Sequence, residues 1–255
     1  MKVCCLFLTC KNSTNKVVME NYSNVARMCA QSNIDLYLYI NDENQTYLDL
    51  GKTCYFSYSH LNYKFHYKYI FPERHKYYYG LMHLPLMDLY ESHPEYDFYL
   101  FYEDDVFFFG DYNIFDKIDF NKDVFFQDKR TIDEDWYWYH NYNNYSALDR
   151  KFYLPWSGCL HIYGMSNKTL EKYIAFIKKR KLHAHHEYSI NSYVLNNNKP
   201  DITISYFPND VTMNCSWDGN TLDDNCYDLM HPIKDESMYL FYKKQKENKK
   251  HIRRT

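Results

Sequence analysis

The chain has 255 residues, with 30 Lys and Arg against 33 Asp and Glu, so its formal net charge is −3. This balance excludes a generally basic nucleic-acid-binding protein, and we expect no nucleic-acid partner. A hydrophobic content of 45% with 25% charged residues excludes wholesale disorder. Aromatic residues make up 20% of the chain, so most rings must pack in the core and only a few can belong to a binding site.

The eight cysteines and the N-terminus indicate the cellular setting. No two cysteines form a CxxC pair, and their scatter predicts neither a disulfide framework nor a zinc ribbon. The first apolar stretch is short for a signal peptide, and no apolar run approaches the roughly 18 residues that span a membrane. We therefore expect a cytoplasmic protein.

The first part of the chain alternates between strand and helix patterns. Val3–Thr9 and Ile34–Ile40 are apolar runs that predict strands. Apolar residues recur between them with helical spacing, at Tyr22, Val25, Ala26 and Cys29. A strand, a helix and a strand in succession predict a parallel βαβ unit.

Further elements follow in the middle of the chain. Cys54–Tyr58 is a candidate short strand, 60–79 is expected to be a loop leading toward a helix, and a helix is predicted from Gly80. Asp97–Tyr102 is a nearly continuous apolar run, which suits a strand buried on both faces of a sheet. A second apolar run ends at Gly110.

The second half predicts fewer elements. Val124–Phe126 and Ile202–Phe207 are expected strands, and helices are expected from about Asn167 and through Ile190 and Val194. Residues 127–150 and the segment after 207 show no period and are expected to be loops. Together these elements predict one α/β domain over residues 1–240, with a mixed, mainly parallel sheet and helices on both faces.

Residues 241–255 form a basic tail with seven Lys or Arg and one Glu. Because polar segments without an apolar period rarely pack, we expect the tail to be mobile or weakly helical. Basic segments are attracted to anionic membrane surfaces, so a peripheral membrane contact is one interpretation of the tail, and a solubilising end is the other.

The strongest chemical signal is Glu103-Asp104-Asp105 at the carboxyl end of the buried run. Ligands bind beyond the carboxyl ends of the strands in open α/β sheets. Adjacent carboxylates are stabilised there by a divalent cation such as Mn²⁺ or Mg²⁺, which is often also held by substrate phosphates. The alternative is an acidic turn that faces water.

The segment YDFYLFYEDDVFF, residues 96–108, resembles the D-x-D-type motif of nucleotide-sugar glycosyltransferases with the GT-A fold. The resemblance implies a single GT-A-like, Rossmann-like domain that binds a nucleotide-diphosphate sugar through Mn²⁺ or Mg²⁺. It implies that Asp105 and Glu103 are metal ligands and that Asp104 contacts the donor. Thr9, Asn12 and Asp42 match places where such enzymes hold the nucleotide.

The resemblance also implies roles for residues late in the chain. Enzymes of this fold often use a late histidine as a metal ligand, which points to His231, and imidazole suits Mn²⁺ better than Mg²⁺. Inverting members use a downstream carboxylate as general base, and Glu187 fits that placement. The alternatives are a surface histidine before a proline turn, and a glutamate that complements a helix dipole.

Aromatic and acidic side chains between the predicted elements are candidates for sugar contacts. Tryptophan rings stack on sugar C–H surfaces while carboxylates bind hydroxyls, and glycine permits a close approach of the backbone. Core packing is the alternative for each ring. The candidate substrate-binding residues are Asp133, Asp135, Trp136, Trp156, Gly158 and His186.

These residues predict a metal-dependent glycosyltransferase acting on a glycan, lipid-linked or protein acceptor. A nucleotidyltransferase or metal phosphohydrolase could use the same carboxylates, although the segment after the first strand is a poor phosphate loop. A Ca²⁺-dependent carbohydrate-binding module is a third possibility. The sequence contains no P-loop, dinucleotide-binding or G-x-S-x-G motif.

Overall fold

The computed structural model describes residues 1–9, 16–41, 52–65, 68–69, 81–129, 131–132, 156–180, 182–183, 186–195, 201–215 and 227–252. Its helices are α1 (Lys16–Gln31), α2 (Tyr58–Lys64), α3 (His83–Ser92), η3 (Ile114–Lys117), α6 (Asn167–Arg180), α7 (His186–Leu195) and α8 (Glu236–Ile252). Its strands are β1 (Val3–Thr9), β2 (Ile34–Asn41), β3 (Thr53–Phe56), β4 (Lys68–Tyr69), β5 (Phe98–Glu103), β6 (Phe107–Phe108), β7 (Val124–Phe126), β8 (Thr131–Ile132), β9 (Trp156–Ser157), β10 (Ile162–Ser166), β11 (Leu182–His183), β12 (Ile204–Tyr206), β13 (Met213–Cys215) and β14 (Leu229–His231).

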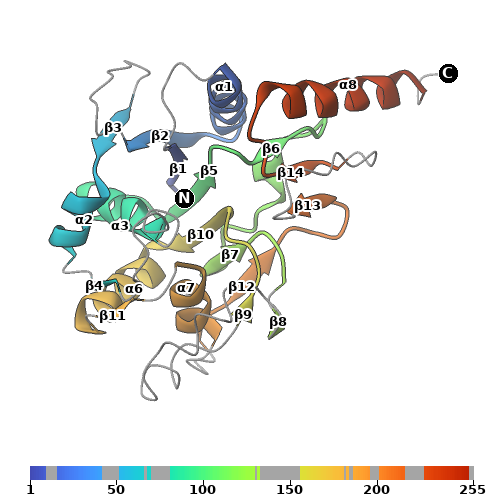
Figure 1. Ribbon diagram of the computed structural model, residues 1–255. Coiled ribbons are helices and arrows are strands. Elements are labelled where there is room, and N and C mark those ends of the chain that lie inside the picture. The colour runs from blue at the N-terminus through green and yellow to red at the C-terminus, as the bar shows by residue number, and fades with distance from the viewer. Residues whose placement is uncertain are drawn as a thin grey trace.

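A seven-stranded sheet forms the centre of the molecule, in the order β12-β7-β10-β5-β1-β2-β3 (Figure 1). The strands β5, β1, β2 and β3 pair in parallel, and β12 pairs in parallel with β7. Only β10 runs antiparallel to both of its neighbours in this sheet. The prediction of one α/β domain with a mixed, mainly parallel sheet is confirmed.

Strand β1 shows why both faces of the sheet are covered. Its residues alternate between two core clusters, with Leu6 and Leu8 in one and Cys5 and Phe7 in the other. Residues of α2, α3, α6 and α7 complete the first cluster, and residues of α1 and η3 complete the second. Since both faces bury apolar side chains, β1 is a continuous apolar run, as a central parallel strand requires.

The antiparallel strand β10 approaches β5 closely at Gly164, which lies opposite Leu100. A Cβ atom on Gly164 would lie 2.4 Å from Cε1 of Phe98 and 2.9 Å from the carbonyl oxygen of Tyr99. Glycine is therefore required where these two strands pack, because the carbonyl oxygen belongs to the ladder and cannot move aside.

Some predicted boundaries were wrong. Helix α2 begins at Tyr58, inside the expected strand Cys54–Tyr58, because Ser57 caps it by accepting a hydrogen bond from the backbone N–H of His60. The helix continues to Lys64, and β4 follows at Lys68–Tyr69, so the expected loop over 60–79 was wrong for its first part. The segment after 207 is not only loop, because β13 and β14 form a three-stranded sheet with β6. Strands of two or three residues are too short for a period to show in the sequence.

The basic tail also packs better than expected. Helix α8 continues to Ile252, so the proposed boundary at 240 falls within it, and Tyr239 and Tyr242 join a core cluster with Val17, Phe107, Met230 and Ile233. Two lysines of α8 form ion pairs with Glu20 and Asp228. The predicted membrane contact therefore gains no support from the structure. In the described part of the chain, no helix is long and apolar enough to cross a membrane.

Candidate metal centre

The acidic triplet lies where β5 ends, at the carboxyl edge of the parallel part of the sheet. Glu103 is the last residue of β5, and Asp104 and Asp105 form the turn into β6. The side chains of Glu103 and Asp104 are buried, and the Asp105 side chain is 21% exposed. The triplet is thus not a water-facing acidic turn, and Asp105 is its most accessible carboxylate.

Asp104 is directed toward the end of β1. Its Oδ2 accepts a hydrogen bond of 2.6 Å from the Thr9 hydroxyl. Asn21 on α1 donates from one side-chain nitrogen to the backbone carbonyl oxygens of Asp104 and Val106, at 2.9 and 2.7 Å. These bonds hold the turn between β5 and β6 against the end of β1 and against α1.

Two histidines, one directly before β10 and one at the end of β14, meet Glu103. His161 directly precedes β10, and its carbonyl oxygen accepts a 3.0 Å hydrogen bond from the Glu103 N–H, while its Nδ1 contacts Glu103 Oε2. His231 ends β14, and its Nε2 lies 3.9 Å from Glu103 Oε2 and 3.4 Å from Asp105 Oδ1. The two imidazole rings stack with their centroids 3.3 Å apart.

Backbone pairing holds this arrangement in place. Strand β14 pairs with β6 through Met230 and Phe107, and the Ile233 N–H donates a 2.9 Å hydrogen bond to the Asp105 carbonyl oxygen. His231 is joined to Pro232 by a cis peptide bond. Glu103, His161 and His231 each offer one ligand atom within 4.8 Å of the others, so the structure brings together two of the predicted ligands with a residue that was not predicted.

The sequence does contain a signal for His161. It begins the apolar segment HIYGMS, which predicts a strand edge. What the sequence lacks is the order of the strands, and only the antiparallel placement of β10 beside β5 sets His161 against Glu103.

Glu187 lies near the centre, in the first turn of α7. It is 2% exposed, and its Oε1 accepts a 3.1 Å hydrogen bond from the Leu160 N–H. Leu160 directly precedes His161, so Glu187 ties α7 to the segment that carries His161. The neighbouring His186 is buried as well.

Of the remaining predicted site residues, Gly158 and Trp156 lie in the described part of the chain and five do not. Gly158 has φ 135°, a conformation that favours glycine, two residues before Leu160. Trp156 lies in β9, although its side chain is outside the described part of the structure. Five predicted site residues lie outside the described residues altogether: Asn12, Asp42, Asp133, Asp135 and Trp136.

The negative charge of Glu103 also affects Tyr163, the second residue of β10. Burial, together with the nearby Glu103 charge, raises the pKa of Tyr163 well above its usual value. The phenol is therefore neutral at physiological pH and adds no charge beside the carboxylates.

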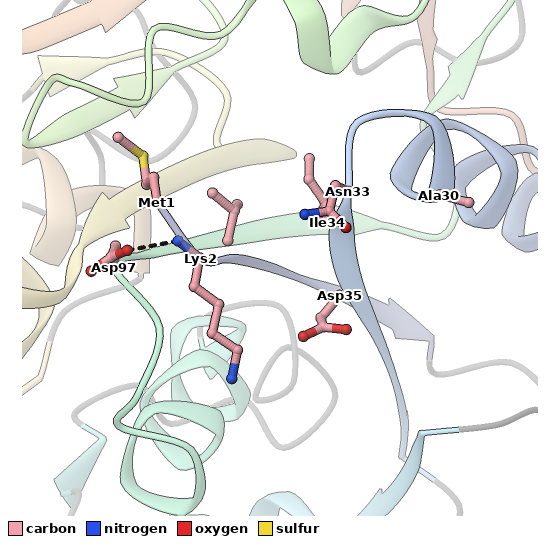
Figure 2. Close-up of a pocket in the computed structure, with 8 residues that line it drawn as sticks. Met1, Lys2, Ala30, Asn33, Ile34, Asp35 and Asp97 are labelled. Carbon is pink, nitrogen blue, oxygen red and sulfur yellow. Dashed lines mark hydrogen bonds between the residues drawn. The ribbon is translucent and has the colours of Figure 1, made fainter.

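A cavity of about 590 Å³ lies at the amino ends of β1 and β2, at the other end of the strands from the acidic triplet. Figure 2 shows Lys2, Asn33, Asp35 and Asp97 around it, with the Lys2 backbone N–H bonded to Asp97. Because the acidic triplet is at the carboxyl edge, this cavity is not part of the candidate centre.

Comparisons with known proteins give similar structures only. No family model matches the chain, and no curated protein matches it. A glycosyltransferase involved in glycosylation of the major capsid of PBCV-1 is 12% identical, with a TM-score of 0.47, and 84% of each chain is covered. The galactosyltransferase LgtC with donor and acceptor sugar analogues is 11% identical, with a TM-score of 0.49 and 96% coverage of each chain.

Mouse xyloside xylosyltransferase 1 is 12% identical, with a TM-score of 0.46, and the match covers 92% of this chain and 100% of that one. All three are glycosyltransferases by name. Because these scores are below 0.5, the function proposed next rests on the residues of this chain.

Proposed function

We propose that the protein is a metal-dependent glycosyltransferase that moves a sugar from a nucleotide-diphosphate sugar to a hydroxyl of a glycan, lipid-linked or protein acceptor. The observation that carries the proposal is the convergence of Glu103, Asp105 and His231 at the carboxyl edge of the sheet. This is the edge where open α/β sheets bind ligands.

The donor set fits a divalent metal ion. Carboxylate oxygens and an imidazole nitrogen are ligands of Mn²⁺ and related ions, and Glu103 and His231 are buried, as ligands of a bound cation often are. When bound, such an ion supplies positive charge that neutralises the leaving diphosphate. Asp105, the most accessible of the carboxylates, is the residue best placed to share the ion with the donor phosphates.

The histidine side chains also help to distinguish the alternative functions. Ca²⁺ takes oxygen ligands, so a centre with histidines beside the carboxylates disfavours a Ca²⁺-dependent binding module. A nucleotidyltransferase or phosphohydrolase remains the second candidate, because the same ligands could hold its metal ion.

We further propose Glu187 as the general base of an inverting reaction. It would accept the proton of the acceptor hydroxyl as that oxygen attacks the anomeric carbon. The hydrogen bond from the Leu160 N–H holds one carboxylate oxygen in a fixed orientation. Its burial requires the acceptor to reach it through the surface that the sugar-binding residues would form.

The remaining contacts are proposals from the sequence. The nucleotide would be held by Asp104, Thr9, Asn12 and Asp42. The sugar and acceptor would be held by Asp133, Asp135, Trp136, Trp156, Gly158 and His186. Of these, Thr9 would act through Asp104, because its hydroxyl is bonded to that carboxylate.

The test is release of nucleoside diphosphate by the full-length protein from a panel of nucleotide sugars, with Mn²⁺, with Mg²⁺ and after EDTA treatment. We expect release that needs metal ion and that falls by at least tenfold in Asp105→Asn, with the exposed Asp201→Asn as the matched control. Pyrophosphate release from nucleoside triphosphates, or phosphate release, would identify the second candidate. Unchanged turnover in EDTA would overturn the metal mechanism.

A further inference from the structure

We propose that His161 is an additional protein ligand of the metal ion, and that the resulting pair of imidazoles selects Mn²⁺ and later first-row transition ions over Mg²⁺. This inference rests on the metal-binding half of the proposed function. It does not depend on the sugar, the acceptor or the catalytic base.

The distances fit one ion shared by Glu103, His161 and His231, with Asp105 beside His231. With metal–ligand bonds of about 2.0–2.2 Å, two ligands of the same ion lie at most about 4.4 Å apart. His231 Nε2 is 3.4 Å from Asp105 Oδ1 and 3.9 Å from Glu103 Oε2. The ligand atoms of His161, Glu103 and His231 all lie within 4.8 Å of one another, so small side-chain rotations suffice.

The surroundings of His161 favour a role for its side chain as a metal ligand. Its side chain is buried at 6% exposure, and its ring stacks on that of His231. Each ligand comes from a β-strand or its edge, and the backbone bonds between β5 and β10 and between β6 and β14 fix their separation. Sites built on such rigid elements hold their geometry within narrow limits.

The composition of the set predicts which ion it prefers. Imidazole is a good ligand for first-row transition ions, whereas Mg²⁺ prefers six oxygen ligands in an octahedron and gives up its waters reluctantly. One histidine is compatible with either class. Two histidines beside two carboxylates shift the preference toward the transition ions, in the order Mn²⁺, Fe²⁺, Co²⁺.

The competing role for His161 is to orient Glu103 through its Nδ1 without touching the ion, as partners of ligating carboxylates do. Pulsed electron paramagnetic resonance of the full-length protein with one equivalent of Mn²⁺ separates the two roles, because it counts directly bound ¹⁴N nuclei. We expect two bound nitrogens in the unaltered protein. A single bound nitrogen, or no stoichiometric Mn²⁺ binding, would overturn the inference.

The variant His161→Gln provides the second readout, with His60→Gln on the exposed face of α2 as its control. Calorimetric titration of the metal-stripped proteins should show Mn²⁺ affinity reduced at least tenfold in His161→Gln, with Mg²⁺ affinity changed less than threefold. Unchanged Mn²⁺ affinity in a folded His161→Gln protein would contradict ligation. If that variant does not fold, the nitrogen count in the unaltered protein still decides.

These outcomes are distinguishable from a failure of the proposed function. Two bound nitrogens in a protein that consumes no nucleotide sugar would support the ligand assignment and reject glycosyl transfer. Metal-dependent nucleotide-sugar turnover with one bound nitrogen would support glycosyl transfer and reject His161 as a ligand.

Discussion

Glu187 combines deep burial with a fixed orientation, and this combination can serve either catalysis or structure. Its Oε1 is bonded to the Leu160 N–H, and a glutamine at this position can keep that bond. Glu187→Gln therefore removes the proton acceptor while keeping the size of the side chain. We expect kcat to fall by about 10²–10⁴-fold, with the dissociation constant for donor changed little.

The exposed Glu171→Gln on α6 is the matched control for this substitution, and steady-state kinetics with separate donor-binding measurements provide the readout. A loss of less than threefold in kcat would show that Glu187 only connects α7 to the Leu160 segment. The base would then have to be sought elsewhere, with Asp133 and Asp135 as the first candidates.

At the scale of residues, the sequence was informative where chemistry is concentrated in a short segment. The acidic triplet at the end of an apolar run indicated the centre, and the structure places His231 3.4 Å from Asp105. His161 could not be assigned in the same way, because its position depends on pairing between β5 and β10, which are separated by about 60 residues in the sequence. The roles of the individual ligands stay predictions.

Helix α8 has few apolar residues, but two of its tyrosines are buried in a core cluster. Tyr242 is 4% exposed and packs in the cluster with Phe107 and Ile233, whereas Leu240, two residues earlier, is 52% exposed. Tyr242→Ala should lower the free energy of unfolding by about 2–4 kcal/mol, because truncation of a buried aromatic ring leaves a cavity.

The control for Tyr242 is Leu240→Ala, which should change the free energy of unfolding by less than about 0.5 kcal/mol because the side chain is exposed. Urea denaturation followed by circular dichroism measures both. Equal small effects at the two positions would mean that α8 does not pack on the domain in solution.

Asp228 couples the small sheet to α8. Burial alone would raise the pKa of this carboxyl group, but hydrogen bonds from Lys246 and from Thr212 outweigh it and hold the pKa below its usual value. A lowered pKa in the folded state stabilises the protein above the unfolded-state pKa of about 3.9, and the stabilisation is lost as the pH falls through the folded-state pKa.

Asp228→Asn should therefore be less stable than the unaltered protein at pH 7, and the difference should shrink toward zero as the pH is lowered below 4. Thermal unfolding between pH 2.5 and 7 measures this, with the exposed Asp201→Asn as control. A difference that stays constant over this range would show that the carboxylate charge of Asp228 is not what stabilises the contact.

At the scale of elements, periodic helices and apolar runs, including the three-residue strand β7, were predictable, whereas the lysine-rich helix α8 and the strands β13 and β14 were not. Helix α8 places Tyr239 and Tyr242 in its core cluster, with Met238 and Phe241 partly buried against it, and charged residues follow, so its apolar period was too weak to distinguish from a solvated tail. The strands β13 and β14 are defined by partners far away in sequence rather than by their own pattern.

In the molecule as a whole, the carboxyl ends and the amino ends of the parallel strands carry different groups of side chains. The carboxyl edge gathers Glu103, Asp105, His161 and His231, and the amino edge holds the cavity beside Lys2 and Asp97. Alternating strand and helix patterns were sufficient to predict the parallel core and its covered faces. The antiparallel placement of β10 was not predictable, because nothing in its own residues specifies its neighbours.

The most direct test of the account is the position of a bound metal ion. Crystals of the full-length protein grown with Mn²⁺ and a nucleoside diphosphate would be measured at a wavelength where manganese scatters anomalously. We predict one strong anomalous peak bonded to Glu103, Asp105, His161 and His231, with diphosphate oxygens completing the coordination. A peak bonded to none of these residues, or diphosphate bound elsewhere without metal ion, would contradict it.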